Sequence, residues 1–395
     1  MLRRETMGAA GFIHPSLADR IIREMDGGAD PGRSERNAAR WGAVLLVGFA
    51  TAGGILASGP SDTRAPGAPT APSQRSILAA SASSNVPMAA PVLGFVWDSA
   101  TTSLRRVEGI PGAALAGTSF FRAGFTGAAV APNQGFALLT DANGGLYFSV
   151  LPSFKPPAMI ASGMPADVRI AFSPSSDWAV LYSPSGTTTF LAAGLNETPA
   201  VREVGSLAGI SGIISAIASD SGAILLARAG SSGVSISSTT AASALTPVTS
   251  IGQLGGMSFL AGTDTAVISD SQNNNLWKVT GIEAAASVSL IAGAPEGVSQ
   301  PGALAISRDN RAVWVTSAAN TALQEFVLTG SSTGPAKVLA APFAISGLER
   351  LNGNSVFRLK GAATGVLFVL DGDWPSGRIV QVPVTHLPPM LGGIQ

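Results

Sequence analysis

The stretch that decides the fold is Ala303-Leu-Ala-Ile-Ser-Arg-Asp-Asn-Arg-Ala-Val-Trp-Val-Thr-Ser317. It predicts a short strand, a tight polar turn, and a second strand of alternating and β-branched apolar residues. The same pattern returns, with different residues, in 130–141, 171–183 and 216–226. The chain is therefore an array of repeats, and this repetition is a stronger signal than any catalytic motif.

The repeat has a nearly constant length. Equivalent positions in the second strand are separated by 42 to 46 residues, and one further period back falls near Gly94. Periods of about 40–45 residues with several short strands are typical of propeller blades, and radial closure removes exposed sheet edges. We therefore predict an all-β propeller of seven four-stranded blades, or of six if 92–107 lies outside the ring. The six anchor positions are Ala137, Ala179, Ile224, Val267, Val313 and Val356.

The two ends of the array are incomplete in different ways. The first unit lacks an innermost strand before Val92, and the last ends in the strand-like segment 378–384. We expect the ring to close by pairing of the two chain ends within one blade. Which end supplies which strand is left open.

The segment 306–317 resembles the YVTN-type β-propeller repeat, whose core reads roughly Ser-Pro-Asp-Gly, then apolar residues, then Tyr-Val-Thr-Asn. Ser173-Pro174 and Tyr182-Ser183 match other parts of that pattern, and the resemblance covers 92–384. It implies a propeller fold without fixing an activity, because such repeats occur in surface, scaffold and lactonase-like proteins. The departures from the pattern are Arg308 for Pro, Asn310 for Gly, Trp314 for Tyr and Ser317 for Asn.

The amino-acid composition excludes several classes of partner and of catalytic or metal site. Charged residues make up 12% of the 395 and the formal net charge is zero, so we expect no nucleic-acid partner. Cysteine is absent, which removes disulfides, thiolate catalysis and cysteine-based metal sites. The two histidines, His14 and His386, lie outside the repeats. We predict neither a metal nor another cofactor.

An export signal precedes the repeats. Residues 1–40 are polar, with a short amphipathic segment at 16–25, and 41–58 are apolar and carry no charge. Arg33, Arg36 and Arg40 precede the apolar segment and no basic residue follows it until Arg64, which predicts a cytoplasmic N-terminus. Everything after the segment is then expected outside the cytoplasmic membrane.

Two interpretations of 41–58 remain open. A cleaved secretory signal would release a periplasmic or secreted protein, whereas an uncleaved helix would anchor it as a single-pass membrane protein. The anchor is favoured because the polar region before the segment is far longer than in most signal peptides. Residues 59–87 are rich in Pro, Ala and Ser and predict a disordered linker, and 88–390 form the propeller domain.

Candidate ligand residues occur in two turns. Asp371, Asp373 and Trp374 place two carboxylates beside an aromatic ring, a combination suited to binding a ligand on one face of the propeller. The segment 270–275 offers oxygen ligands for a hard cation such as calcium, although it lacks a second carboxylate. Ordinary turn chemistry is the favoured interpretation of both segments, because Asp, Asn and Gly favour turns.

The sequence also predicts which tryptophans are buried and whether one turn serine is exposed. Trp97, Trp178, Trp277 and Trp314 are predicted to pack between blades, and a recognition surface is the alternative. Ser317 is predicted to be an exposed turn residue that tolerates change.

The function favoured by these patterns is a membrane-anchored binding or scaffold module for a protein or a small ligand. The alternative is a lactonase-like hydrolase or lyase that uses the turn carboxylates Asp177, Asp220 or Asp309. A self-assembling surface-layer role is a third interpretation. No phosphate loop, serine elbow or His-Glu-x-x-His motif is present in the sequence.

Overall fold

The computed structural model describes most of the region predicted to be the propeller, and all described residues belong to the unit 84–395. The polar tail 1–40, the apolar segment 41–58 and the linker 59–87 lie outside the described residues, as do both histidines. Within the described ranges no helix is long and apolar enough to cross a membrane. These ranges are 90–120, 124–153, 155–240, 243–329, 334–361 and 366–384.

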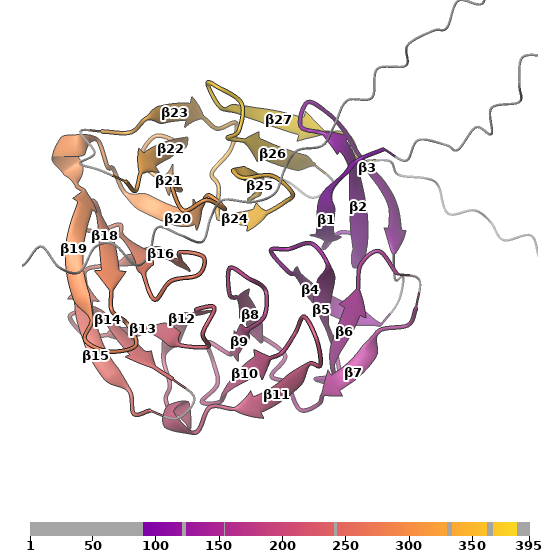
Figure 1. The fold of residues 1–395 in the computed structure, drawn as a ribbon, viewed down its shortest axis with the longest axis horizontal. Coiled ribbons are helices and arrows are strands. Elements are labelled where there is room, and N and C mark those ends of the chain that lie inside the picture. Colours follow the sequence, from indigo (N-terminus) through magenta and orange to yellow (C-terminus); the bar gives the residue numbers. More distant parts are fainter. Residues whose placement is uncertain are drawn as a thin grey trace, which may run out of the picture. The chain divides into compact units, whose positions relative to one another are not determined.

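Seven antiparallel sheets, here called blades 1 to 7 in chain order, surround a central axis (Figure 1). In blades 2 to 7 the strands run outward from the axis in chain order, and two short 3-10 helices, Gly205–Leu207 and Ala294–Glu296, lie between blades. The strands are β1 (Val92–Asp98), β2 (Ser103–Ile110) and β3 (Ala113–Phe120) in blade 1; β4 (Phe125–Val130), β5 (Phe136–Asp141), β6 (Leu146–Val150) and β7 (Ala158–Ala161) in blade 2; β8 (Arg169–Phe172), β9 (Ala179–Tyr182), β10 (Thr189–Ala193) and β11 (Ala200–Glu203) in blade 3; β12 (Ile213–Ala218), β13 (Ile224–Gly230), β14 (Gly233–Thr239) and β15 (Thr246–Ile251) in blade 4; β16 (Leu254–Phe259), β17 (Ala266–Asp270), β18 (Asn275–Thr280) and β19 (Ser287–Ala292) in blade 5; β20 (Pro301–Ile306), β21 (Ala312–Ser317), β22 (Ala322–Val327) and β23 (Lys337–Ala340) in blade 6; β24 (Gly347–Arg350), β25 (Val356–Lys360), β26 (Leu367–Asp371) and β27 (Arg378–Val382) in blade 7.

The predicted number of blades is confirmed, and six is wrong, because β1–β3 form a blade of the ring. The prediction of four strands in every blade fails at blade 1, which has three among the described residues. As expected, the strand that this blade lacks is the innermost one. The last described residues reach β3 of blade 1, where the Ala116 N–H donates to the Pro383 carbonyl at 2.9 Å and Val384 forms a parallel bridge with Ala116.

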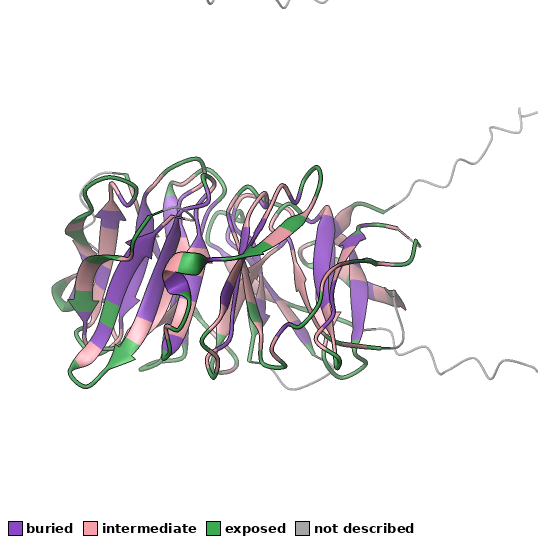
Figure 2. Ribbon diagram, turned by 90° about the horizontal axis from the view of Figure 1, so that it is seen from below, coloured by how far each residue is buried: buried purple, intermediate pink, exposed green. Residues whose placement is uncertain are grey.

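The core consists of layers between neighbouring blades. All six residues of β21 are buried, because apolar side chains on both faces of this strand meet the adjacent sheets. Trp314 is fully buried and packs with Phe357 and Leu370 of blade 7. Figure 2 shows buried residues running through the middle of the blades and exposed ones gathered in the loops.

The other three tryptophans also pack between blades, as predicted. Trp178 and Trp277 are partly buried against the cores around blades 3–4 and 4–5, and Trp97 lies against the core between blades 1 and 2. The expectation for Ser317 is wrong. It is the last residue of β21, it is buried, and its hydroxyl donates to the Ser299 carbonyl at 2.6 Å, because the connection entering blade 6 passes over it.

Candidate functional site

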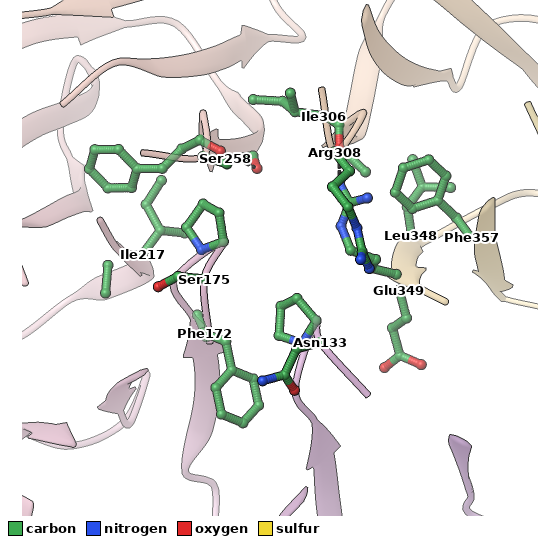
Figure 3. A pocket seen from close by; sticks show the side chains of 18 of the residues that line it. Asn133, Phe172, Ser175, Ile217, Ser258, Ile306, Arg308, Leu348, Glu349 and Phe357 are labelled. Atoms are coloured by element: carbon green, nitrogen blue, oxygen red, sulfur yellow. Dashed lines mark hydrogen bonds between the residues drawn. The ribbon is translucent and has the colours of Figure 1, made fainter. Parts of the chain in front are cut away.

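The candidate site is a cavity of about 580 Å³ on the propeller axis (Figure 3). The innermost strands β4, β8, β12, β16, β20 and β24 line it, together with the turns that follow several of them. Apolar side chains such as Phe172, Ile217 and Leu348 form much of the wall. The polar side chains come mainly from the turns, so the groups able to bind a ligand by hydrogen bonds or charge lie at one mouth of the cavity.

A closed circle of hydrogen bonds joins the blades at this mouth. Each bond links the turn after one innermost strand to a neighbouring blade, and blade 1 takes part through the edge of β1. The contacts are Asn133 N–H to Ser176 Oγ (3.0 Å), Ser175 N–H to Asp220 Oδ1 (2.6 Å), Gly262 N–H to Asp220 Oδ2 (2.7 Å), Asn310 Nδ2 to Ala261 O (2.8 Å), Asp309 N–H to Asn354 Oδ1 (2.9 Å), Asn352 N–H to Leu93 O (2.8 Å) and Phe95 N–H to Gln134 Oε1 (2.6 Å).

The three turn carboxylates of the hydrolase alternative all accept hydrogen bonds from other groups of the protein. Asp220 spans three blades, because its two oxygens accept from N–H groups in blades 3 and 5. Asp309 accepts from the Ser307 hydroxyl at 2.6 Å, which is the main cause of its lowered pKa, and Asp177 is 3.5 Å from Asn196 Nδ2. Of these three, only Asp220 lines the cavity. The hydrolase activity stays a prediction.

Two arginines stand on the blade 6 and blade 7 side of the mouth. Arg308 follows β20 and its side chain has no hydrogen-bond or ion-pair partner among the described residues. Figure 3 shows it directed into the space enclosed by the lining residues. Arg350, the last residue of β24, donates to the carbonyls of Ile306 and Asn354 and lies over the Phe357 ring.

The positive charge of Arg308 affects the pKa of the neighbouring Arg350. Burial, and secondly the neighbouring charge of Arg308, lower the pKa of Arg350 to about 10, although Asp373 and Asp309 act in the opposite direction. The partners of the Arg350 guanidinium are neutral carbonyls, so its positive charge is not cancelled by a direct ion pair. This side of the mouth therefore carries two guanidinium groups, neither of which is in a direct ion pair within the described ranges.

Glu349 is the other charged residue of β24 that lines the cavity. Its carboxylate pairs with Arg358 at 3.1 Å and with Lys360 at 2.6 Å. Burial alone would raise the pKa of Glu349, but the charges of Lys360 and Arg358 outweigh it and lower the pKa. This carboxylate is thus neutralised by two cations of its own blade and does not pair with Arg308.

The predicted ligand residues Asp371, Asp373 and Trp374 lie together at the turn between β26 and β27, and none of them lines the cavity. Asp371 is buried and pairs with Arg378 at 2.9 Å, and Arg378 lies over the Trp374 ring at 4.0 Å. Asp373 accepts from the N–H groups of Asn354 and Ser355. Their role as a ligand face stays a prediction.

The turn 270–275 is held by hydrogen bonds within the chain. Asp270 accepts from the N–H groups of Gly252, Gln253 and Asn273 and from the side-chain amide of Asn273. Over the described ranges no group of three or more His, Cys, Asp or Glu side chains is placed to hold a metal ion.

Sequence reasoning missed Arg350, Glu349 and Gln134 as residues of the site. Arg308 was visible only as a departure from the repeat, standing where proline is usual. A better sequence signal was a polar residue other than glycine in the turn after an innermost strand. Gln134, Ser176 and Asn310 occupy such positions with positive φ, and all three bond to the preceding blade.

Comparisons with known proteins add the fold alone. No family model and no curated protein matches the chain. A functionally unknown protein from Desulfotomaculum acetoxidans DSM 771 is similar in structure, with a TM-score of 0.53 and 13% identity over 75% of this chain and 100% of that one. Streptogramin B lyase gives 0.49 and 10% over 68% and 86%, and the β-propeller domain of Myceliophteria thermophila Cps50 (Swd1) gives 0.48 and 10% over 67% and 88%. The YVTN resemblance stays a prediction.

Proposed function

We propose that the chain is an exported, membrane-anchored propeller that acts as a binding module, and that its ligand places an anionic group beside Arg308 at the mouth of the central cavity. The propeller fold supports a binding or scaffold role, since such folds present ligands on one face. The single observation that carries the ligand class is the unpaired Arg308 side chain in the cavity, next to the half-buried Arg350.

The physical argument concerns desolvation and charge. Arg308 is exposed at the mouth, but apolar side chains line the same cavity, and a guanidinium beside an apolar surface attracts an anion more strongly than one in open water, because the effective dielectric constant is lower. The apolar lining around Phe172 and Ile217 would contact the rest of the ligand. A carboxylate or phosphate on a small organic or peptide ligand has the matching chemistry.

Titration calorimetry tests this with acetate, succinate, citrate and inorganic phosphate at constant ionic strength. Loss of one charge-assisted contact in Arg308→Gln should weaken binding by about 10-fold to 100-fold. Arg311→Gln is the matched control, because Arg311 lies in the same turn, is highly exposed and does not line the cavity. Equal affinities in the wild type and Arg308→Gln would contradict the proposed contact.

The location is a separate part of the proposal. Its support is the uncharged segment 41–58 with three arginines shortly before it. Protease added to intact spheroplasts should digest the propeller and spare the 1–40 tail. Digestion of the tail alone would reverse the orientation, and a mature protein beginning near Pro60 would identify 41–58 as a cleaved signal.

A further inference from the structure

Within the described ranges, the inner edge of blade 1 is covered by side chains and a turn, and no strand pairs with it. The Leu93 carbonyl accepts from Asn352 N–H at 2.8 Å and Phe95 N–H donates to Gln134 Oε1 at 2.6 Å. The Trp97 carbonyl accepts from the Arg358 guanidinium at 2.8 Å. These alternate residues carry the backbone groups that an innermost strand would pair with.

A cavity of about 260 Å³ lies between blades 1 and 7, beside the half of this edge that contains Val96 to Asp98, here called the lower half. It is lined by Val96, Trp97 and Asp98 from β1 and by Leu359 and Leu367 from blade 7. Val384, the last described residue before the chain continues into 385–395, also lines it. The cavity therefore begins where the C-terminal segment departs.

The sequence of that segment repeats an innermost strand of the same propeller. Leu391-Gly-Gly-Ile-Gln395 corresponds to Leu254-Gly-Gly-Met-Ser258 at the start of β16. The step from the last residue of β27 to Leu391 is nine residues, and the step from the last residue of β19 to the first of β20 is also nine.

The register of blade 5 shows where these residues would pair. In that blade Leu254 lies opposite Asp270, and a β-bulge at Gly255 is followed by Gly256 opposite Ser269 and Met257 opposite Ile268. Asp98 ends β1 as Asp270 ends β17. Transfer of the register places Leu391 opposite Asp98, Gly393 opposite Trp97, and Ile394 opposite Val96.

The apolar packing agrees with this register. Met257 packs with Ile268 in the core between blades 4 and 5. Val96 belongs to the equivalent core between blades 1 and 7, together with Val369, and Val384 packs against that core. Ile394 opposite Val96 would therefore enter an apolar layer at the cavity that already exists.

We propose that residues 391–395 of the chain form the innermost strand of blade 1, occupying the cavity between blades 1 and 7 along Trp97 and Asp98. The strand covers the lower half of the β1 edge, and Asn352 and Gln134 cover the upper half at Leu93 and Phe95. The Arg358 contact with the Trp97 carbonyl is replaced by a backbone hydrogen bond. The inference does not depend on Arg308 or on any ligand.

Engineered cysteines test the register in the full chain, which has no cysteine of its own. The pair Val96→Cys and Ile394→Cys should form an intramolecular disulfide, because residues opposite each other at a non-hydrogen-bonded position bring their Cβ atoms close. The pair Val96→Cys and Gln395→Cys is the control, since adjacent strand residues point to opposite faces. Non-reducing electrophoresis and mass spectrometry of the linked peptides give the yields.

An equal yield in the two pairs would overturn the proposal, and so would a disulfide between two copies, which would mean strand exchange. Hydrogen exchange gives a second measurement that needs no core substitution. The Trp97 N–H shares the edge of the Trp97 carbonyl and should exchange slowly in the full chain and much faster after truncation at Val384. Equally fast exchange in both proteins would also overturn the proposal.

Discussion

The side-chain amide of Gln134 in blade 2 donates from Nε2 to the carbonyl oxygen of Arg350 in blade 7 at 2.6 Å, across 216 residues of sequence. Its oxygen accepts from Phe95 N–H of blade 1 at 2.6 Å. One buried side chain thus joins three blades at the inner edge of blade 1, where the described residues contain no innermost strand. Gln134 connects blades 7, 1 and 2 by hydrogen bonds, as Asp220 connects blades 3, 4 and 5.

Shortening this side chain should weaken ring closure. Gln134→Asn keeps an amide and a residue that tolerates the positive φ of 61°, but it cannot reach both partners. Loss of two buried hydrogen bonds should lower the free energy of unfolding by about 1–3 kcal/mol in urea denaturation. Gln253→Ala, at an exposed side chain without a partner among the described residues, is the control and should unfold like the wild type.

Replacement of Trp314 by alanine should be among the most damaging single changes. The side chain is fully buried between blades 6 and 7, so Trp314→Ala should cost about 3–5 kcal/mol through lost burial and the cavity left behind. Trp374→Ala offers a comparison, because Trp374 is 48% exposed and should cost about 1 kcal/mol or less. Thermal unfolding followed by circular dichroism would show whether the two variants differ as stated.

Asp220→Asn should separate a structural carboxylate from a catalytic one. The amide keeps one acceptor oxygen and places an NH₂ group against an N–H donor, so one of the two inter-blade bonds is lost. We expect a loss of about 1.5–3 kcal/mol in the free energy of unfolding. Asp264→Asn, at a side chain with no partner in the described part of the chain, serves as control. An unchanged unfolding midpoint in Asp220→Asn would show that the two hydrogen bonds of Asp220 to blades 3 and 5 do not stabilise the ring.

Acid should destabilise the propeller through its turn carboxylates. The Gly145 N–H and the Tyr147 hydroxyl lower the pKa of Asp141 below its ordinary value of 3.8. For Asp270, burial raises the pKa, but the bonds from Asn273, Gln253 and Gly252 outweigh it and the pKa is lowered. The unfolded chain therefore binds more protons below about pH 4, so stability present above that pH is lost as pH falls through the lowered folded values.

The measurement is the melting temperature between about pH 6 and pH 2. Asp270→Asn should melt lower than the wild type at neutral pH, and the difference should shrink as the pH falls, because protonation removes the same interactions from the wild type. Parallel curves for the two proteins would show that Asp270 does not contribute through its charge.

The sequence by itself determined that the fold is a propeller and which segments form its blades, because a period of 42 to 46 residues reflects the strand and turn lengths of one blade, whereas the structure decided between six blades and seven. It also located the buried tryptophans, since alternation along a strand is a local property that survives in any packing of the sheets. The sequence also indicated that no strand-like segment directly before Val92 supplies the innermost strand of blade 1.

Only the tertiary structure decided what the turn residues do. Asp220, Gln134 and Arg308 occupy similar turns in the repeat, yet the first two bind neighbouring blades and the third points into the cavity without a partner. Ser317 follows the same rule, because its burial comes from a connection that packs over it. Turn propensity depends on a few neighbouring residues, whereas hydrogen bonding between blades depends on ring closure, which brings together residues as far apart as Gln134 and Arg350.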